Sequence, residues 1–170
     1  MTADGFRALY NQTAVDLLNF LRRRTPTPEH AADCLADTFL IAWSKRDQIP
    51  TEPADARPWL FGVARNVLKR DRALDHKASA TVEALALHLQ DRPASVPAND
   101  VLTLALGQLA PIDREIIEML AWDHLAPREV AAILGFSPNA VRIRAHRARI
   151  KLREQLRVAE PACDDCLPSA

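Results

Sequence analysis

The stretch REVAAILGFSPNAVR, residues 128–142, decides the fold class of this chain. Its first half places small and apolar residues at helical spacing. Gly135 follows, and glycine readily adopts the positive φ that a tight turn between two helices requires. Ser137 and Pro138 follow as an N-cap and a first helical residue, so a second helix begins directly after the turn. This spacing predicts a helix-turn-helix.

The second of these helices has one apolar stripe and an otherwise polar surface. The stripe recurs at steps of four, three, four and four residues, at Val141, Ala145, Ala148, Leu152 and Leu156. Such a helix fits the major groove of DNA with its stripe against the core. The candidate DNA-contacting residues are Ser137, Asn139, Arg142, Ile143, His146, Arg147 and Arg149. Those near the helix start suit base edges and the later arginines suit phosphates, while an arginine-rich bundle helix remains the alternative.

The zero net charge of the chain hides two basic segments and one acidic segment. Residues 137–158 hold seven basic residues and one acidic residue, and residues 57–77 hold six basic and two acidic residues. Residues 26–56 reverse the balance, with six acidic and two basic residues. Because the distribution of charge matters more for nucleic-acid binding than its sum, DNA is not excluded as a partner. Each run taken alone also fits a solvated helix face.

The periodicity of the chain predicts helices throughout. Apolar residues at spacings of three, four and seven predict helices over residues 6–24, 28–44 and about 58–76 in the first half. A short helix over residues 83–89 is also compatible with the sequence. In the second half, four helices are predicted: from the N-cap Asn99 to Leu109, from Pro111, over residues 127–134, and from Pro138.

These elements predict an all-α chain of two small helical bundles, the second a helix-turn-helix domain, joined by a flexible linker. The boundaries fall where composition changes, with proline-containing sequence over residues 91–97. The predicted units are a first domain at 1–77, a linker at 78–98, a second domain at 99–158 and an acidic tail at 159–170.

Composition limits the classes of function. No apolar run approaches the length of a membrane span, and the N-terminus lacks a secretory signal, so a cytoplasmic location is expected. The chain shows no glycine-rich loop, no paired carboxylate–histidine cluster and no strong metal-ligand spacing, so we expect no enzyme, no catalytic residue, no cofactor and no metal.

The three cysteines do not predict a disulfide framework, because their number is odd and no signal precedes them. Cys34 lies in an apolar helical pattern and is expected in the core. Cys163 and Cys166 form a C-x-x-C in the tail, which is compatible with a redox pair, with half of a zinc site, or with no function.

Five passages of the chain resemble the extracytoplasmic-function (ECF) sigma factors, a group of bacterial RNA polymerase sigma factors. They are FRALY (6–10), ADCLADTFLIAW (32–43), PWLFGVARN (58–66), LAPIDREII (109–117), and REVA through HRAR (128–149). They occur in the family's order and cover about residues 5–76 and 99–157. The resemblance implies a factor that binds core RNA polymerase, recognises and melts promoter DNA, starts transcription, and is held by an anti-sigma factor.

The resemblance also implies roles for individual residues. The second helix would dock on the polymerase through Asp33, Asp37, Leu40 and Trp43. The third helix and the connection at 49–57 would hold the melted minus-ten element, with a flipped base, through Arg57, Arg65, Asn66, Lys69 and Arg70. The last helix would read the minus-thirty-five element, and the linker would thread through the polymerase. Trp43 and Trp59 also fit a core position.

Three positions depart from the family pattern: Arg70 stands where many relatives have Asp, Ala126 where a capping Ser or Thr is usual, and Ile143 where a polar residue is common. These departures bear on which promoter sequence the protein would recognise, and not on the resemblance to the sigma-factor family. The alternative from another class is a stand-alone helix-turn-helix regulator that binds duplex DNA. It explains the second half of the chain but not the acidic-then-basic first half.

Overall fold

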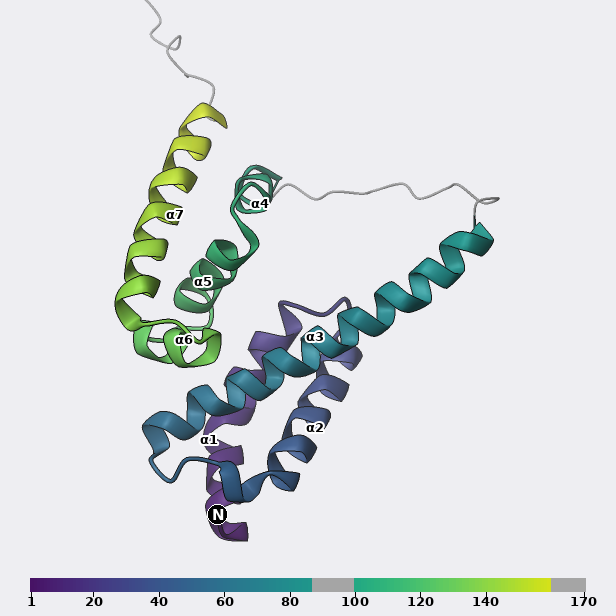
Figure 1. Ribbon diagram of the computed structural model, residues 1–170, viewed down its shortest axis with the longest axis vertical. Helices are drawn as coiled ribbons and strands as arrows, with labels where there is room; N and C mark the ends of the chain where they lie inside the picture. Colours follow the sequence, from purple (N-terminus) through teal and green to yellow (C-terminus); the bar gives the residue numbers. More distant parts are fainter. Residues whose placement is uncertain (87–99, 160–170) are drawn as a thin grey trace, which may run out of the picture.

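The computed structural model describes residues 1–86 and 100–159, which form seven α-helices and a short 3₁₀ turn and contain no strand (Figure 1). The first domain holds α1 (Ala3–Arg22), α2 (Pro28–Ser44), the 3₁₀ turn Arg46–Gln48 and α3 (Pro53–Ala86). The second holds α4 (Asp100–Gly107), α5 (Pro111–Ala121), α6 (Pro127–Leu134) and α7 (Pro138–Ala159). The all-α prediction is confirmed. No helix in these two ranges combines the length and apolar character that crossing a membrane requires.

Some predictions fall outside the described residues. They are the N-cap at Asn99, the linker between residues 87 and 98, the helix end at 87–89, and the tail with Cys163 and Cys166.

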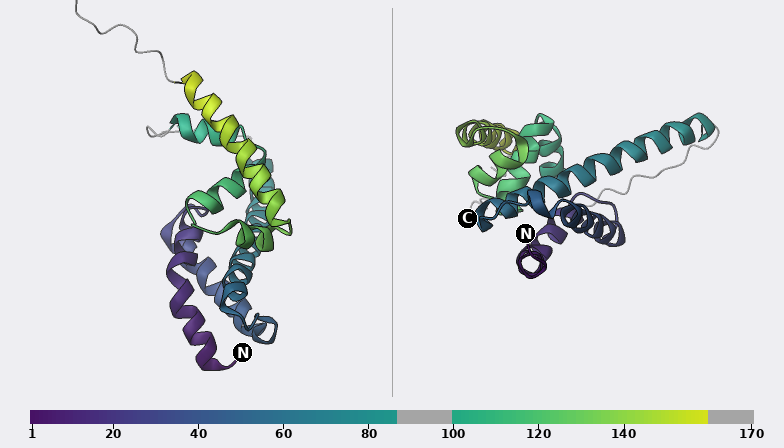
Figure 2. Two further views of the ribbon diagram at one scale, coloured as in Figure 1. Left: turned by 90° about the vertical axis from the view of Figure 1, so that its left-hand side faces the viewer. Right: turned by 60° about the horizontal axis from the view of Figure 1, so that its bottom comes forward.

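The first domain is a three-helix bundle in which α3 runs well beyond the other two helices (Figures 1 and 2). Its largest fully buried apolar side chains come from the facing stripes of α1 and α3: Leu17, Phe20, Leu21, Leu60 and Phe61. The Phe20 and Phe61 rings meet edge to face, with centroids 5.3 Å apart. This geometry favours aromatic pairs beyond the apolar area they bury. α1 and α3 are therefore fixed against each other at the centre of the bundle.

The bounds predicted for α1 and α3 were wrong in part. α1 begins at Ala3 rather than Phe6, because the Thr2 hydroxyl caps it by accepting from the Gly5 amide at 3.2 Å. α3 begins at Pro53, and Pro58 lies inside it, in its second turn. A proline this near a helix start removes one hydrogen bond without ending the helix. The rule that proline marks the first helical residue fits Pro53 equally well.

α3 also ends later than predicted, at Ala86 rather than near residue 76. Residues 77–86 hold no glycine or proline, and four of them are alanines. These residues have good helix propensity, so nothing local stops the helix. The helix therefore takes up residues 78–86, which the sequence had assigned to the linker.

The second domain is a four-helix unit that contains the predicted helix-turn-helix. Ile116, Met119, Val130 and Val141 are fully buried where α5, α6 and α7 meet. The predicted stripe of α7 is confirmed, since Val141, Ala145, Ala148 and Leu152 are all buried and Leu156 packs against them in part. α4 ends at Gly107, two positions before the predicted Leu109.

The turn between α6 and α7 depends on Gly135, which has φ 74° and ψ 30°. We expect Gly135→Ala to destabilise the second domain by about 1–2 kcal/mol, because a Cβ in the left-handed region clashes with its own backbone. A Cβ at this position meets no other atom within 4 Å, so the whole effect is conformational. Thermal unfolding of the variant measures it.

Gly62, inside α3, provides the control for this prediction. A Cβ there also meets nothing within 4 Å, and its φ is ordinary. Gly62→Ala should therefore stabilise the protein by about 0.5–1 kcal/mol. Equal effects of the two substitutions would contradict the role assigned to Gly135.

Candidate nucleic-acid and protein interfaces

The predicted contact residues of α7 gather on its solvent side. Ser137 caps the helix as predicted, since its Oγ accepts from the Ala140 amide at 3.1 Å. Exposed beyond it are Asn139, Arg142, Ile143, His146, Arg147 and Arg149. The solvent side of α7 is therefore a polar and basic face with two exposed apolar side chains, Ile143 at 44% and, two turns later, Ile150 at 41%. That combination fits base edges, phosphates and a thymine methyl group.

Glu129 holds the start of α6 and also binds α3 of the first domain. Its Oε2 accepts from the Ala126 amide at 2.7 Å, which is one half of a capping box. The other half is missing because the Ala126 methyl group accepts no hydrogen bond. Oε1 of the same carboxylate accepts from Arg57 Nη1 at 2.8 Å, and Arg57 Nη2 donates to Asp16 Oδ2 at 3.0 Å.

Arg65 on α3 forms a bidentate ion pair with Glu115 on α5 in the other domain. Its Nε and Nη2 donate to the two carboxylate oxygens of Glu115 at 2.6 and 2.7 Å. The hydrogen bonds to Glu115 raise the pKa of Arg65 despite its partial burial. For Arg57, burial opposes the charged form, but the bonds to Asp16 and Glu129 outweigh it and the pKa is raised as well. Two of the predicted minus-ten residues are therefore covered by carboxylates in this conformation.

The other three minus-ten candidates on α3 are accessible. Asn66 and Lys69 are exposed, and Arg70 is exposed but donates from Nη2 to Asp37 Oδ2 at 2.7 Å. A hollow of about 210 Å³ lies beside them, lined by Ile41, Lys45, Val63, Asn66, Val67 and Arg70. It lies between α2 and α3. The resemblance implied a base pocket at the connection 49–57 and the start of the third helix, and that placement stays a prediction.

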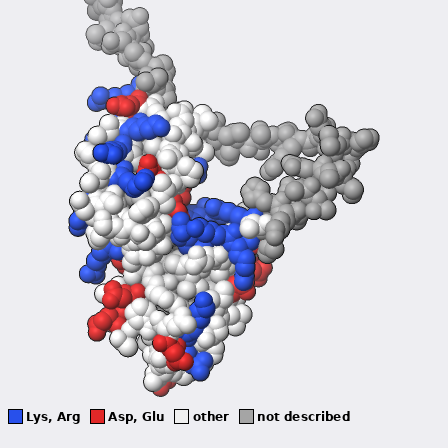
Figure 3. Space-filling model, in the orientation of Figure 1, with Lys and Arg blue, Asp and Glu red and all other residues white. Residues whose placement is uncertain are grey.

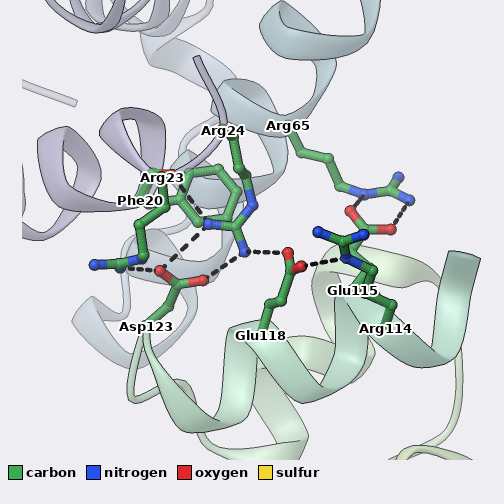
Figure 4. A network of polar contacts seen from close by, with 8 residues as sticks. All are labelled: Phe20, Arg23, Arg24, Arg65, Arg114, Glu115, Glu118 and Asp123. Carbon is green, nitrogen blue, oxygen red and sulfur yellow. Dashed lines mark hydrogen bonds and ion pairs between the residues drawn. The ribbon is translucent and has the colours of Figure 1, made fainter. Parts of the chain in front are cut away.

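A network of ion pairs, here called the clasp, closes the two domains on each other (Figure 4). Asp123, whose side chain is only 1% exposed, pairs with both Arg23 and Arg24 from the end of α1. Arg24 Nη2 lies 2.8 Å from Asp123 and 3.6 Å from Glu118, and its guanidinium sits 3.9 Å from the Phe20 ring centroid. The sequence alone did not pair these arginines with Asp123.

Basic side chains gather in the cleft between the domains, where Figure 3 shows them as a blue cluster. The cleft has a volume of about 750 Å³, and its basic lining residues are Arg23, Arg24, Arg65, Lys69, Arg72 and Arg114. Glu115 and Glu118 on α5 face them. The cleft therefore places the carboxylates of the second domain against the basic surface of α3.

The predicted docking residues share the outer face of α2. Asp33 is exposed, Asp37 is half-buried beside Arg70, and Leu40 and Trp43 are 66% and 42% exposed. Trp43 is therefore not a core residue. Its ring packs edge-on against Phe6, with centroids 5.0 Å apart. Trp59, by contrast, is half-buried against the core.

Comparison with known proteins identifies the family. The models of Sigma-70 region 2 and Sigma-70 region 4 match residues 9–77 and 99–152. The sigma factor CarQ of Myxococcus xanthus is 32% identical over 90% of each chain, and the ECF sigma factor SigL of Mycobacterium tuberculosis is 31% identical over 86% of each. The chain belongs to the ECF sigma factors. As an ECF sigma factor it binds core RNA polymerase and directs promoter recognition in transcription initiation.

Solved structures agree with this identification. CnrH, solved in complex with the cytosolic domain of CnrY, is 27% identical to this sigma factor, with a TM-score of 0.62 over 94% of this chain and 92% of that one. RpoE of Bartonella quintana, solved with the anti-sigma factor NepR, shares the fold, with a TM-score of 0.64, 23% identity, and coverage of 93% of this chain and 100% of that one.

The sigma factor also contains a cluster that the sequence did not predict. His30 and Cys34 on α2 meet Asp71 on α3, and their ligand atoms all lie within 4.8 Å of one another. The expectation that the chain has no carboxylate–histidine cluster was therefore wrong. Burial, and then the charges of Asp71, Asp37 and Asp33, raise the pKa of the Cys34 thiol. A thiol in that state is a poor nucleophile.

Proposed function

We propose that this ECF sigma factor is a non-enzymatic, cytoplasmic initiation factor that is closed when free and opens to act. The observation that carries the proposal is the pairing of Arg65 with Glu115, supported by that of Arg57 with Glu129. Both arginines belong to the surface assigned to the minus-ten element, and both partners belong to the second domain. Single-stranded phosphates would have to replace these carboxylates, so the domains must separate before α3 can hold DNA.

The two domains divide promoter recognition. In the domain at 99–158, α7 reads the minus-thirty-five element. In the domain at 1–77, Arg57, Arg65, Lys69 and Arg70 follow the melted strand, and Asn66 contacts a flipped base in the hollow between α2 and α3. The segment 78–98 sets the spacing between them, and α3 continues into it as far as Ala86.

Polymerase docking and DNA binding meet at the Asp37–Arg70 pair. Asp37 belongs to the docking face of α2 and Arg70 to the DNA surface of α3, and the two side chains are 2.7 Å apart. Both are about half exposed, so the pair itself contributes little to stability. A cationic group on the polymerase that engages Asp37 would free Arg70 for a phosphate.

A protein partner is expected to hold the closed form. RpoE was solved with an anti-sigma factor and CnrH with the cytosolic domain of CnrY. We infer that an anti-sigma factor binds this chain as well, and the exposed apolar side chains Leu40 and Trp43 on the docking face are a surface it would cover. Binding there would block polymerase docking directly.

Arg142 and Arg147 should separate base reading from phosphate binding. Arg142→Ala should cost about 1–3 kcal/mol on the specific minus-thirty-five sequence and relax specificity at one base pair. Arg147→Ala should weaken binding to all sequences alike and reduce the salt dependence by about one phosphate contact. Binding of holoenzyme to promoter variants over a range of salt concentrations measures both. Identical specificity profiles for the two variants would contradict the assignment.

Run-off transcription tests the proposed function as a whole. The full chain should co-purify with core polymerase and direct specific transcripts, and it should bind duplex promoter DNA weakly by itself. The alternative, a stand-alone helix-turn-helix regulator, predicts the opposite: tight duplex binding alone and no polymerase-dependent transcript. The latter outcome would overturn the proposal.

A further inference from the structure

We propose that His30, Cys34 and Asp71 form a binding site for a divalent metal ion, suited to Zn²⁺, that fastens α2 to α3. The three residues offer an imidazole nitrogen, a thiol sulfur and a carboxylate oxygen, all within 4.8 Å of one another. The site lies outside the surfaces assigned to DNA and polymerase contact, although it borders both.

The backbone places these ligands without strain. His30 and Cys34 are four residues apart on α2, so their side chains lie on one face, one turn apart. Asp71 approaches from α3, and His30 Nε2 donates to Asp71 Oδ2 at 2.8 Å. Ligands of a tetrahedral zinc ion are about 3.5 Å apart, because the bonds to zinc are about 2.0–2.3 Å long. A small side-chain rotation therefore admits an ion in place of the shared proton.

The electrostatics of the cluster favour a cation. Besides Asp71, the carboxylates of Asp33 and Asp37 act on Cys34, with Arg70 as the opposing charge. Burial and these carboxylates raise the pKa of the thiol. A divalent ion reverses that balance, since it stabilises the thiolate and is attracted by the same carboxylates. The thiol proton passes to solvent as the metal–sulfur bond forms.

The donor set selects the kind of ion. Thiolate and imidazole ligands favour zinc and exclude magnesium and calcium, which take oxygen ligands. Three protein ligands leave a fourth position for water. Access is open on one side, because the side chains of His30 and Asp71 are 27% and 31% exposed, while Cys34 is buried.

The alternative is that His30 and Asp71 form only a hydrogen bond that supports helix packing, with Cys34 as a core side chain beside it. That arrangement binds no ion. A metal-binding assay distinguishes the two hypotheses, because only the first predicts that an ion binds. The tail cysteines must be replaced first, since their thiols could bind the added ion. The background for the test is therefore the full chain with Cys163→Ser and Cys166→Ser.

Titration of this background protein with Co²⁺ and Zn²⁺ is the test. We expect one equivalent of Co²⁺ to give tetrahedral d–d bands and a thiolate-to-cobalt charge-transfer band, which Zn²⁺ then displaces. Zn²⁺ at about a hundredfold excess over its Kd should raise the Tm by about 5 °C or more. Cys34→Ser should abolish the charge-transfer band, and His30→Ala and Asp71→Asn should each weaken binding at least about tenfold.

His146→Gln is the matched control, since it removes an exposed histidine on α7 that is not a member of the cluster and should change nothing in the metal titration. Circular dichroism checks that each variant remains folded. Absence of the cobalt bands in the folded background protein would overturn the proposal, as would Zn²⁺ binding that the Cys34 and His30 variants leave unchanged. Neither result bears on transcription, so the proposed function stands or fails separately.

Discussion

Asp123→Ala is expected to open the free sigma factor. Asp123 is the carboxylate at the centre of the clasp. Its removal leaves Arg23 without its clasp partner and leaves Arg24, whose side chain is only 8% exposed, with the more distant Glu118 at 3.6 Å as its remaining carboxylate. Removing one partner of a buried ion pair costs about 3–5 kcal/mol. We expect a cost of about 3 kcal/mol, the lower end of that range, for two reasons. Arg23 already reaches solvent, and both arginines become hydrated when the domains separate. A change of about 3 kcal/mol shifts the closed–open equilibrium about 150-fold.

Small-angle X-ray scattering of the free chain measures this opening as a larger radius of gyration. Binding of a single-stranded minus-ten oligonucleotide should strengthen in parallel, because Arg65 is released from Glu115. Far-UV circular dichroism should stay unchanged, which separates opening from unfolding of the second domain.

Arg114→Ala is the control for the clasp. Arg114 pairs with Glu118 at 2.7 Å within α5, but its side chain is 44% exposed and the pair lies on one helix. Such pairs contribute about 0.2–0.5 kcal/mol, so scattering should not change. The charge-swapped double variant Asp123→Arg with Arg24→Asp should restore part of the closure. An unchanged radius of gyration in Asp123→Ala would show that the clasp does not hold the domains.

Local patterns made the second domain predictable. The turn at Gly135, the cap at Ser137 and the stripe beginning at Val141 each lie within a few residues of the feature they specify. Helix periodicity and capping act over one or two turns, so they can be read directly from the sequence. The predicted start of α3 was wrong because this local signal is ambiguous there. Pro53 and Pro58 each fit the first residue of a helix, and only the folded structure shows that the helix begins at Pro53.

Pairings between distant residues were not predictable. Asp123 and Arg23 are 100 positions apart, and nothing near either residue identifies the other. The same holds for Arg65 and Glu115, so the sequence assigned Arg65 to DNA without showing that a carboxylate covers it in the free chain. His30 and Cys34 are one helical turn apart and could have been noticed as a pair. Asp71 joins them only through the packing of α2 on α3.

Trp43→Ala is expected to be the most damaging substitution on the docking face. Trp43 is 42% exposed at the end of α2, with its ring held by Phe6 on one side and the Arg46 guanidinium 5.3 Å from its centroid. A tryptophan that is positioned in advance and half exposed has the properties of an interface anchor, whose truncation costs about 2–4 kcal/mol. Affinity for core polymerase should therefore fall about 30- to 1,000-fold, as measured by competition for core against the wild-type chain.

Trp122→Ala provides a closely matched control, because Trp122 is 40% exposed but lies at the end of α5 in the second domain. If the docking face is on α2, this variant should bind core polymerase as the wild type does. Leu40→Ala should show an intermediate loss, since Leu40 is 66% exposed on the same face and makes a smaller anchor. Equal losses at Trp43 and Trp122 would assign the polymerase contact to both domains alike, and loss at Trp122 alone would move it away from α2.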